Sequence, residues 1–107
     1  TLESVLGALE ALAAIDAPDR LAVMGPLVDG KAYVELIHTI ARERAEQLGL
    51  EMLAYRAPDY GTPVVEHRRQ LRERVDALPD GSAVLIKGSR NDVIDEVIAE
   101  LIDHPGI

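Results

Sequence analysis

Three short apolar runs alternate with amphipathic helical patterns along this chain. The runs occupy residues 20–24, 51–56 and 83–87, and glycine or proline follows each within two residues. Short apolar runs that end at such turn residues are typical of buried strands. Strands joined through helices must run parallel, because each crossover returns the chain to the same end of the sheet. The alternation therefore predicts an α/β fold with a mainly parallel sheet and helices on both faces.

Four segments carry the helical patterns. In residues 1–14 and 31–48 apolar residues recur at helical spacing, and Gly49 is expected as the residue just past the end of the second helix. Thr62 followed by Pro63 predicts the cap and first turn of a third helix that runs to about residue 77. Its charged residues are expected to face solvent, with Arg69 and Glu73 as an i, i+4 pair, and Ser89 with Asp92 predicts a capping box that opens the last helix.

The chain is long enough for one small domain. It has 107 residues, of which 48% are hydrophobic, and no repeat or linker divides it, so residues 1–107 are predicted to form a single domain. Three strands are few for an open sheet, which averages five to six. Either short strands lie within the predicted loops, or part of the sheet lies outside these residues.

Composition excludes several classes of function. With 19 acidic and 11 basic residues the net charge is −8, which would repel a phosphate backbone, so we expect no nucleic-acid partner. There is no cysteine and the three histidines are dispersed, so no metal site is predicted. No apolar run approaches the roughly 20 residues that span a bilayer. We expect a cytoplasmic protein without a membrane partner.

Cations gather where the third apolar run meets the last helix. Lys87 ends the run, Gly88 breaks it, and Ser89 and Arg90 lead into the helix. Ligands of open parallel sheets bind beyond the carboxyl ends of the strands. An ammonium, a planar guanidinium, a hydroxyl and the free N–H groups of a helix start together suit a carboxylate or phosphate. This pattern predicts an anion site.

A structural role is the alternative for these residues. Ser89 would then only cap the helix, and Lys87 and Arg90 would be solvated or paired with Asp92 and Asp95. Surface charges often contribute nothing measurable, so spacing alone does not separate the two interpretations.

Three other residues are candidates for a site. His38 lies at the edge of the apolar stripe of residues 31–48, where a partly buried structural histidine is expected. Asp29 and Asp59 lie in loops and have the chemistry to bind a metal or an amine, although loop aspartates more commonly form turns.

The chain also resembles a known family. "AVLIKGSR" with its following helix is similar to the C-terminal domain of Mur ligases, in particular the branch that adds D-alanyl-D-alanine to UDP-N-acetylmuramoyl-tripeptide. "SVLGALEALAAI" resembles the helix that opens that domain, and "RLAVMG" followed by His38 resembles its "IAVLGDM…ELG…H" segment. The family's Asp, Met and Glu in that segment are Pro26, Leu27 and Asp29 here, and the following glycine is shifted to Gly30. The resemblance spans nearly the whole chain.

The resemblance implies ATP-driven amide formation by a three-domain enzyme. A central domain with a Walker A loop, which this chain lacks, would bind ATP and Mg and phosphorylate the tripeptide carboxylate. The C-terminal domain, a Rossmann-like three-layer sandwich, would present D-alanyl-D-alanine as the attacking amine. The partners implied are this dipeptide, the UDP-muramoyl peptide and the rest of the ligase chain. No catalytic residue is expected here, and the isolated domain should be inactive. The substrate-binding residues implied are Lys87, Ser89 and Arg90, with Gly88, His38 and Asp29 as further candidates.

Two other functions remain open at this point. The chain could be the matching domain of a Mur-type ligase that adds a single amino acid such as glutamate, although "KGSR" favours the dipeptide branch. It could also be a non-catalytic module that binds a small ligand or regulates another protein, which the altered "GPLVDG" loop favours.

Overall fold

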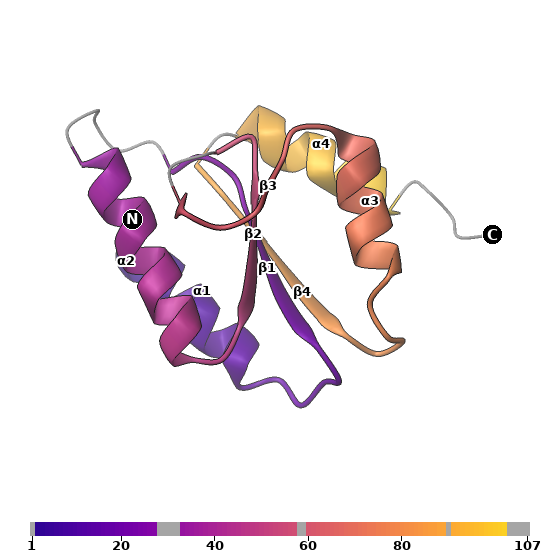
Figure 1. The fold of residues 1–107 in the computed structure, drawn as a ribbon, viewed down its shortest axis with the longest axis horizontal. Coiled ribbons are helices and arrows are strands. Elements are labelled where there is room, and N and C mark those ends of the chain that lie inside the picture. The colour runs from indigo at the N-terminus through magenta and orange to yellow at the C-terminus, as the bar shows by residue number, and fades with distance from the viewer. Residues whose placement is uncertain (1, 28–32, 58–59, 90, 103–107) are drawn as a thin grey trace.

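The protein is a three-layer α/β sandwich built on a parallel sheet (Figure 1). The computed structural model describes residues 2–27, 33–57, 60–89 and 91–102, without the side chains of residues 91 and 92. The strands are β1 (Arg20–Met24), β2 (Glu51–Tyr55), β3 (Val64–Val65) and β4 (Ala83–Lys87). The helices are α1 (Leu2–Ala13), α2 (Val34–Gln47), α3 (Arg68–Asp76) and α4 (Asn91–Ile102).

All strand pairs are parallel, in the order β3-β2-β1-β4. The predicted fold class is therefore confirmed, and the three predicted strands lie within one residue of their expected bounds. Met24 of β1 lies opposite Ala54 on β2 and Lys87 on β4, so the carboxyl ends of β1, β2 and β4 form one edge. We call this the carboxyl edge.

The predicted start of the third helix was wrong. Thr62 and Pro63 do not open a helix; Val64–Val65 forms the short strand β3, and α3 begins only at Arg68. The β-branched pair instead extends the sheet, because the N–H of Ala54 donates to Pro63 O and that of Arg56 donates to Val65 O, both at 2.9 Å. A short strand was thus present within a predicted loop.

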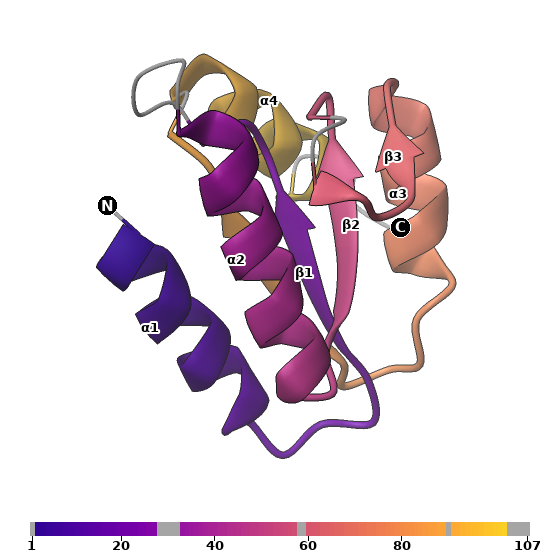
Figure 2. The same cartoon turned by 60° about the vertical axis from the view of Figure 1, so that its left-hand side comes forward.

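The helices pack on opposite faces of the sheet, α1 and α2 on one and α3 and α4 on the other (Figures 1 and 2). The α1/α2 face buries Leu9, which is fully inaccessible, together with Ala22 and Met24 of β1. The opposite face buries Leu71 of α3 against Val23 and other strand residues. Successive side chains of β1 point to opposite faces of the sheet, so this strand contributes to the core on both sides.

Two local features predicted from the sequence, at the end of α2 and on α3, are present in the structure. Gly49 follows the last residues of α2 with φ = 71°, the left-handed conformation that glycine adopts without strain. Arg69 and Glu73 form the expected i, i+4 ion pair at 3.5 Å, and both side chains are largely exposed.

Among the described residues, no helix has the length and apolar character needed to cross a membrane.

Candidate functional site

The loops after β1 and β4 meet directly at the carboxyl edge. The N–H of Gly25 donates to Lys87 O at 2.8 Å, and the N–H of Ser89 donates to Pro26 O at 2.9 Å. After β1 the chain forms β2 on one side of β1, whereas β4 lies on the other side. The strand order therefore reverses between β1 and β4. Open α/β sheets bind their ligands at such a point.

Three of the predicted site residues lie here. Lys87 is the last residue of β4 and is half-buried, Gly88 packs against Gly25, and Ser89 is exposed just before α4. In the described part of the chain, no carboxylate lies within ion-pair distance of the Lys87 ammonium. Ser89 lies two residues further along the same turn.

Other predicted residues lie outside the described structure. Arg90 and Asp29 are among them, as is Asp59, so their placement at the carboxyl edge stays a prediction. The capping box of Ser89 and Asp92 stays a prediction too, because the Asp92 side chain is not described.

His38 is buried behind the loop that follows β1. Only 2% of its surface is exposed, and its Nε2 accepts a hydrogen bond from the N–H of Leu27 at 3.1 Å. Its ring stacks on that of Tyr60, with centroids 3.9 Å apart and planes 6° apart. The Tyr60 hydroxyl donates to Gly25 O at 2.9 Å. These residues hold the Gly25–Leu27 segment from behind and do not face solvent.

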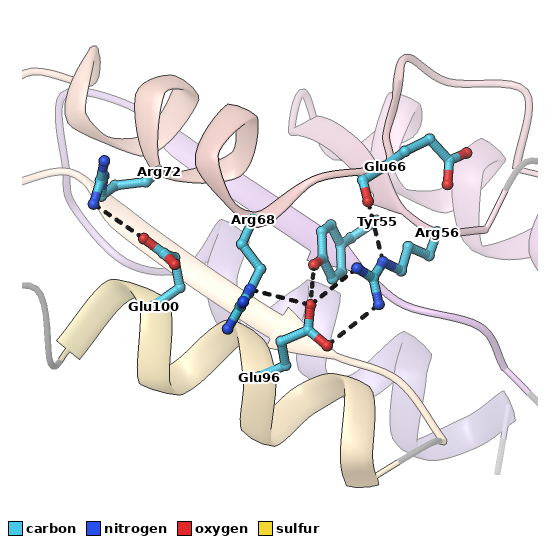
Figure 3. Close-up of polar contacts among 7 residues, drawn as sticks. All are labelled: Tyr55, Arg56, Glu66, Arg68, Arg72, Glu96 and Glu100. Atoms are coloured by element: carbon cyan, nitrogen blue, oxygen red, sulfur yellow. Dashed lines mark hydrogen bonds and ion pairs between the residues drawn. The ribbon is translucent and has the colours of Figure 1, made fainter.

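A second polar cluster, centred on Glu96, was not predicted from the sequence (Figure 3). The hydroxyl of Tyr55, at the end of β2, donates to the Glu96 carboxylate of α4 at 2.6 Å. The guanidinium of Arg56 approaches the same carboxylate to 3.2 Å and that of Arg68 to 3.6 Å. One carboxylate thus connects the end of β2 with α3 and α4.

Arg56 adopts a strained backbone conformation in this cluster. Its φ of 54° lies in the left-handed region, which is unfavourable for a residue with a Cβ. Its Nε donates to Glu66 O at 3.1 Å while its other nitrogens contact Glu96. A glycine at this position would be unstrained but would lack these side-chain contacts.

The Tyr55 hydroxyl stays protonated at neutral pH. Burial, and then the hydrogen bond and negative charge of Glu96, raise the pKa of Tyr55 to about 12. The hydroxyl therefore acts as a hydrogen-bond donor to the carboxylate and does not act as a base near pH 7.

Replacing Tyr55 by phenylalanine is expected to lower the free energy of unfolding by about 1 kcal/mol, since Glu96 loses one donor but keeps two guanidiniums. Denaturant unfolding measures the change. The matched control is Tyr33→Phe, whose side chain is 63% exposed and should change stability by less than about 0.5 kcal/mol. Equal effects of the two substitutions would mean that the Tyr55 hydroxyl contributes no stabilising contact.

An apolar cavity of about 380 Å³ lies away from the carboxyl edge, beside β2 and α3. Its two charged residues, Glu51 and Arg74, pair with each other. It contains none of the predicted site residues. In the described part of the chain, no cluster of three or more His, Cys, Asp or Glu residues could hold a metal ion. The cavity is lined by Leu21, Glu51, Met52, Leu53, Pro63, Val65 and Arg74.

Comparison with known proteins identifies a structural relative. No family model matches the sequence, and neither does any curated protein. Among solved structures, the chain is similar to the crystal structure of MurF ligase from Thermotoga maritima in complex with ADP, with a TM-score of 0.79 and 18% sequence identity. The similarity covers 94% of this chain and 25% of the MurF chain, so this chain spans about a quarter of the length of that enzyme. At this identity the similarity establishes a shared fold.

Proposed function

We propose that the chain is the C-terminal domain of a Mur-type ligase that adds D-alanyl-D-alanine to UDP-N-acetylmuramoyl-tripeptide, a cytoplasmic step of peptidoglycan precursor synthesis. The observation that carries this proposal is the agreement of two independent features. The segment "AVLIKGSR" resembles this family, and the fold is similar to MurF ligase over 94% of the chain. Lys87, Gly88 and Ser89 of that segment lie at the carboxyl edge, where this class of fold binds ligands.

In this proposal the domain supplies the incoming amine and not the phosphoryl chemistry. The free carboxylate of the dipeptide would bind the Lys87 ammonium, the Ser89 hydroxyl and Arg90, which leaves its amino group directed away from the edge. The central domain of the intact enzyme would hold ATP and Mg and activate the tripeptide carboxylate. The hydrogen bond from the Gly25 N–H to Lys87 O, at 2.8 Å, fixes the loops after β1 and β4 relative to each other. The donors of the loop after β4 are therefore positioned before the ligand binds.

Titrating the chain with D-alanyl-D-alanine tests the proposal. We expect the amide signals of Gly88 and Ser89 to shift in NMR spectra, with a dissociation constant on the order of 1 mM, because a dipeptide makes few contacts with one domain. Lys87→Met should weaken this binding several-fold without unfolding the chain. Glutamate serves as the comparison ligand. Stronger binding of glutamate would favour a ligase that adds a single amino acid, and binding of neither ligand would contradict the proposed site.

ATP provides a separate test of how the chemistry is divided between domains. The sequence lacks the Gly-rich loop whose N–H groups bind phosphates, and positioning those phosphates is most of the catalysis in phosphoryl transfer. We therefore expect the purified chain neither to hydrolyse ATP nor to form an amide bond. Steady release of phosphate, measured with and without D-alanyl-D-alanine, would show that this division is wrong.

A further inference from the structure

β4 lies at one edge of the sheet but has the composition of a central strand. Among the described residues it pairs with β1 on one side and with no strand on the other. Its sequence, "AVLIK", is apolar up to the last residue, and all five residues are only half-buried. β1 and β2 each bury four of their five residues. An apolar edge of this kind can pair with a further strand.

Two residues of β4 direct their backbone groups to the open side. The N–H of Ala83 donates to Asp19 O, on the β1 side. Backbone groups of successive strand residues point to alternate sides, so the N–H and C=O of Val84 and Ile86 point away from β1. In the described part of the chain, no other strand lies there to pair with them. These groups form a template for a strand beside β4.

An apolar flank of α4 extends the open edge. Glu96 and Glu100 of α4 form ion pairs with arginines of α3. Ile98, two residues from each, therefore lies on the flank of α4 that points away from α3, and it is 38% exposed. α3 contacts β3 and α4 contacts β4, at opposite edges of the sheet, so this flank lies past β4. A strand placed beside β4 would cover Ile98.

The direction of the crossovers indicates the origin of such a strand. α2 carries the chain from β1 to β2, away from β4. α1 lies on the same face of the sheet as α2 and contacts both β4 and β1 (Figure 2). Parallel crossovers are almost always right-handed, so a strand that leads into α1 must lie on the side of β1 away from β2. β4 occupies the adjacent position, so the place of that strand is beyond β4.

We propose that the open edge of β4 binds a fifth parallel strand, which precedes α1 in the polypeptide of the intact ligase. The inference rests on the proposed function for the presence of polypeptide before α1, as in MurF ligase, of which the similarity covers only 25%. With α1 over one face and α4 over the other, this strand would be covered on both sides. We therefore expect a short apolar run rich in β-branched residues, without alternation of apolar and polar residues.

Hydrogen exchange of backbone amides tests the proposal. In the dilute 107-residue chain, the amides of Val84 and Ile86 should exchange at least about tenfold faster than that of Leu85, after correction for intrinsic rates. In the intact protein, the protection of Val84 and Ile86 should rise at least about tenfold. The Leu85 amide is the internal control, because it pairs with β1 and should be protected in both. Fast exchange of Val84 and Ile86 in the intact protein would overturn the proposal.

The same measurement identifies other occupants of the edge. If Val84 and Ile86 are already protected in the dilute 107-residue chain, a segment of that chain covers them. If their protection in this chain rises with its concentration, a second copy binds there. Either result would overturn the proposal.

Amide-bond formation by the intact protein with D-alanyl-D-alanine, measured in parallel, separates this proposal from the proposed function. Activity with an unprotected edge would refute only the strand. A protected edge without activity would support the strand and refute only the function.

Discussion

Replacing Gly88 by alanine is expected to lower the free energy of unfolding by about 1–3 kcal/mol, the usual effect of overpacking a tight site. A Cβ at this position would lie 3.1 Å from Cδ1 of Ile94 and 3.2 Å from Cα of Gly25. The end of the Ile94 side chain can rotate away. The Gly25 backbone cannot move freely, because its N–H donates to Lys87 O and its carbonyl accepts the Tyr60 hydroxyl. The added methyl group therefore forces the two loops of the carboxyl edge apart.

Other glycines provide matched controls for this substitution. A Cβ on Gly7, in the middle of α1, would meet nothing within 4 Å, so Gly7→Ala should stabilise the protein by about 0.5–1 kcal/mol through helix propensity. A Cβ on Gly25 would make only ordinary contacts, at 3.6 Å or more, so Gly25→Ala should be milder than Gly88→Ala. Denaturant midpoints of the three variants give the comparison. A neutral Gly88→Ala would mean that the edge can open without strain.

Hydrophobic periodicity was sufficient to predict the sheet, because three of its strands are buried or half-buried runs joined through amphipathic helices. It failed at residues 62–67. Thr62 and Pro63 carry a genuine helix-start signal, but Val64 and Val65 can pair with the free edge of β2, and that tertiary contact outweighs the local preference. A strand of two residues has too few positions to show an alternating pattern, so sequence alone does not reveal it.

In the candidate site, too, some residues could be predicted from the sequence and others could not. Lys87, Gly88 and Ser89 are contiguous, so a motif finds them and the strand order then explains their position. The partners of His38 are not predictable, because the Leu27 N–H and the Tyr60 ring reach it only after β1, α2 and the loop after β2 have packed.

The Glu96 cluster was missed for a related reason. Arg68 and Arg72 recur at i, i+4 on α3, and their partners Glu96 and Glu100 recur at the same spacing on α4. This matched spacing is visible in the sequence. It indicates a contact only once α3 and α4 are known to lie side by side on one face of the sheet. The charged run of α3 was expected to face solvent throughout. This holds for Arg69, whose side chain is 83% exposed, but is wrong for Arg72, whose side chain is only 28% exposed and pairs with Glu100.

Replacing Arg90 by alanine in the intact ligase that our proposal requires is expected to raise the KM for D-alanyl-D-alanine about ten- to hundredfold, with little change in the KM for ATP. A carboxylate that leaves water needs donors of matching shape, and a guanidinium offers two parallel hydrogen bonds. The loss of one charge-assisted contact of this kind costs about 1.5–3 kcal/mol, which corresponds to that range of affinity. Steady-state kinetics with each substrate varied in turn measures both constants.

Two further variants test whether the change in KM is specific to binding of the dipeptide carboxylate. Arg69→Ala removes an arginine that is 83% exposed on α3 and should leave both constants unchanged. Arg90→Lys keeps the charge but loses the paired geometry, so it should recover only part of the loss. Thermal unfolding of each variant shows whether the domain is intact. If Arg90→Ala leaves the dipeptide kinetics unchanged, or weakens both substrates in step with a lower Tm, then Arg90 stabilises the start of the last helix and the carboxylate is bound elsewhere.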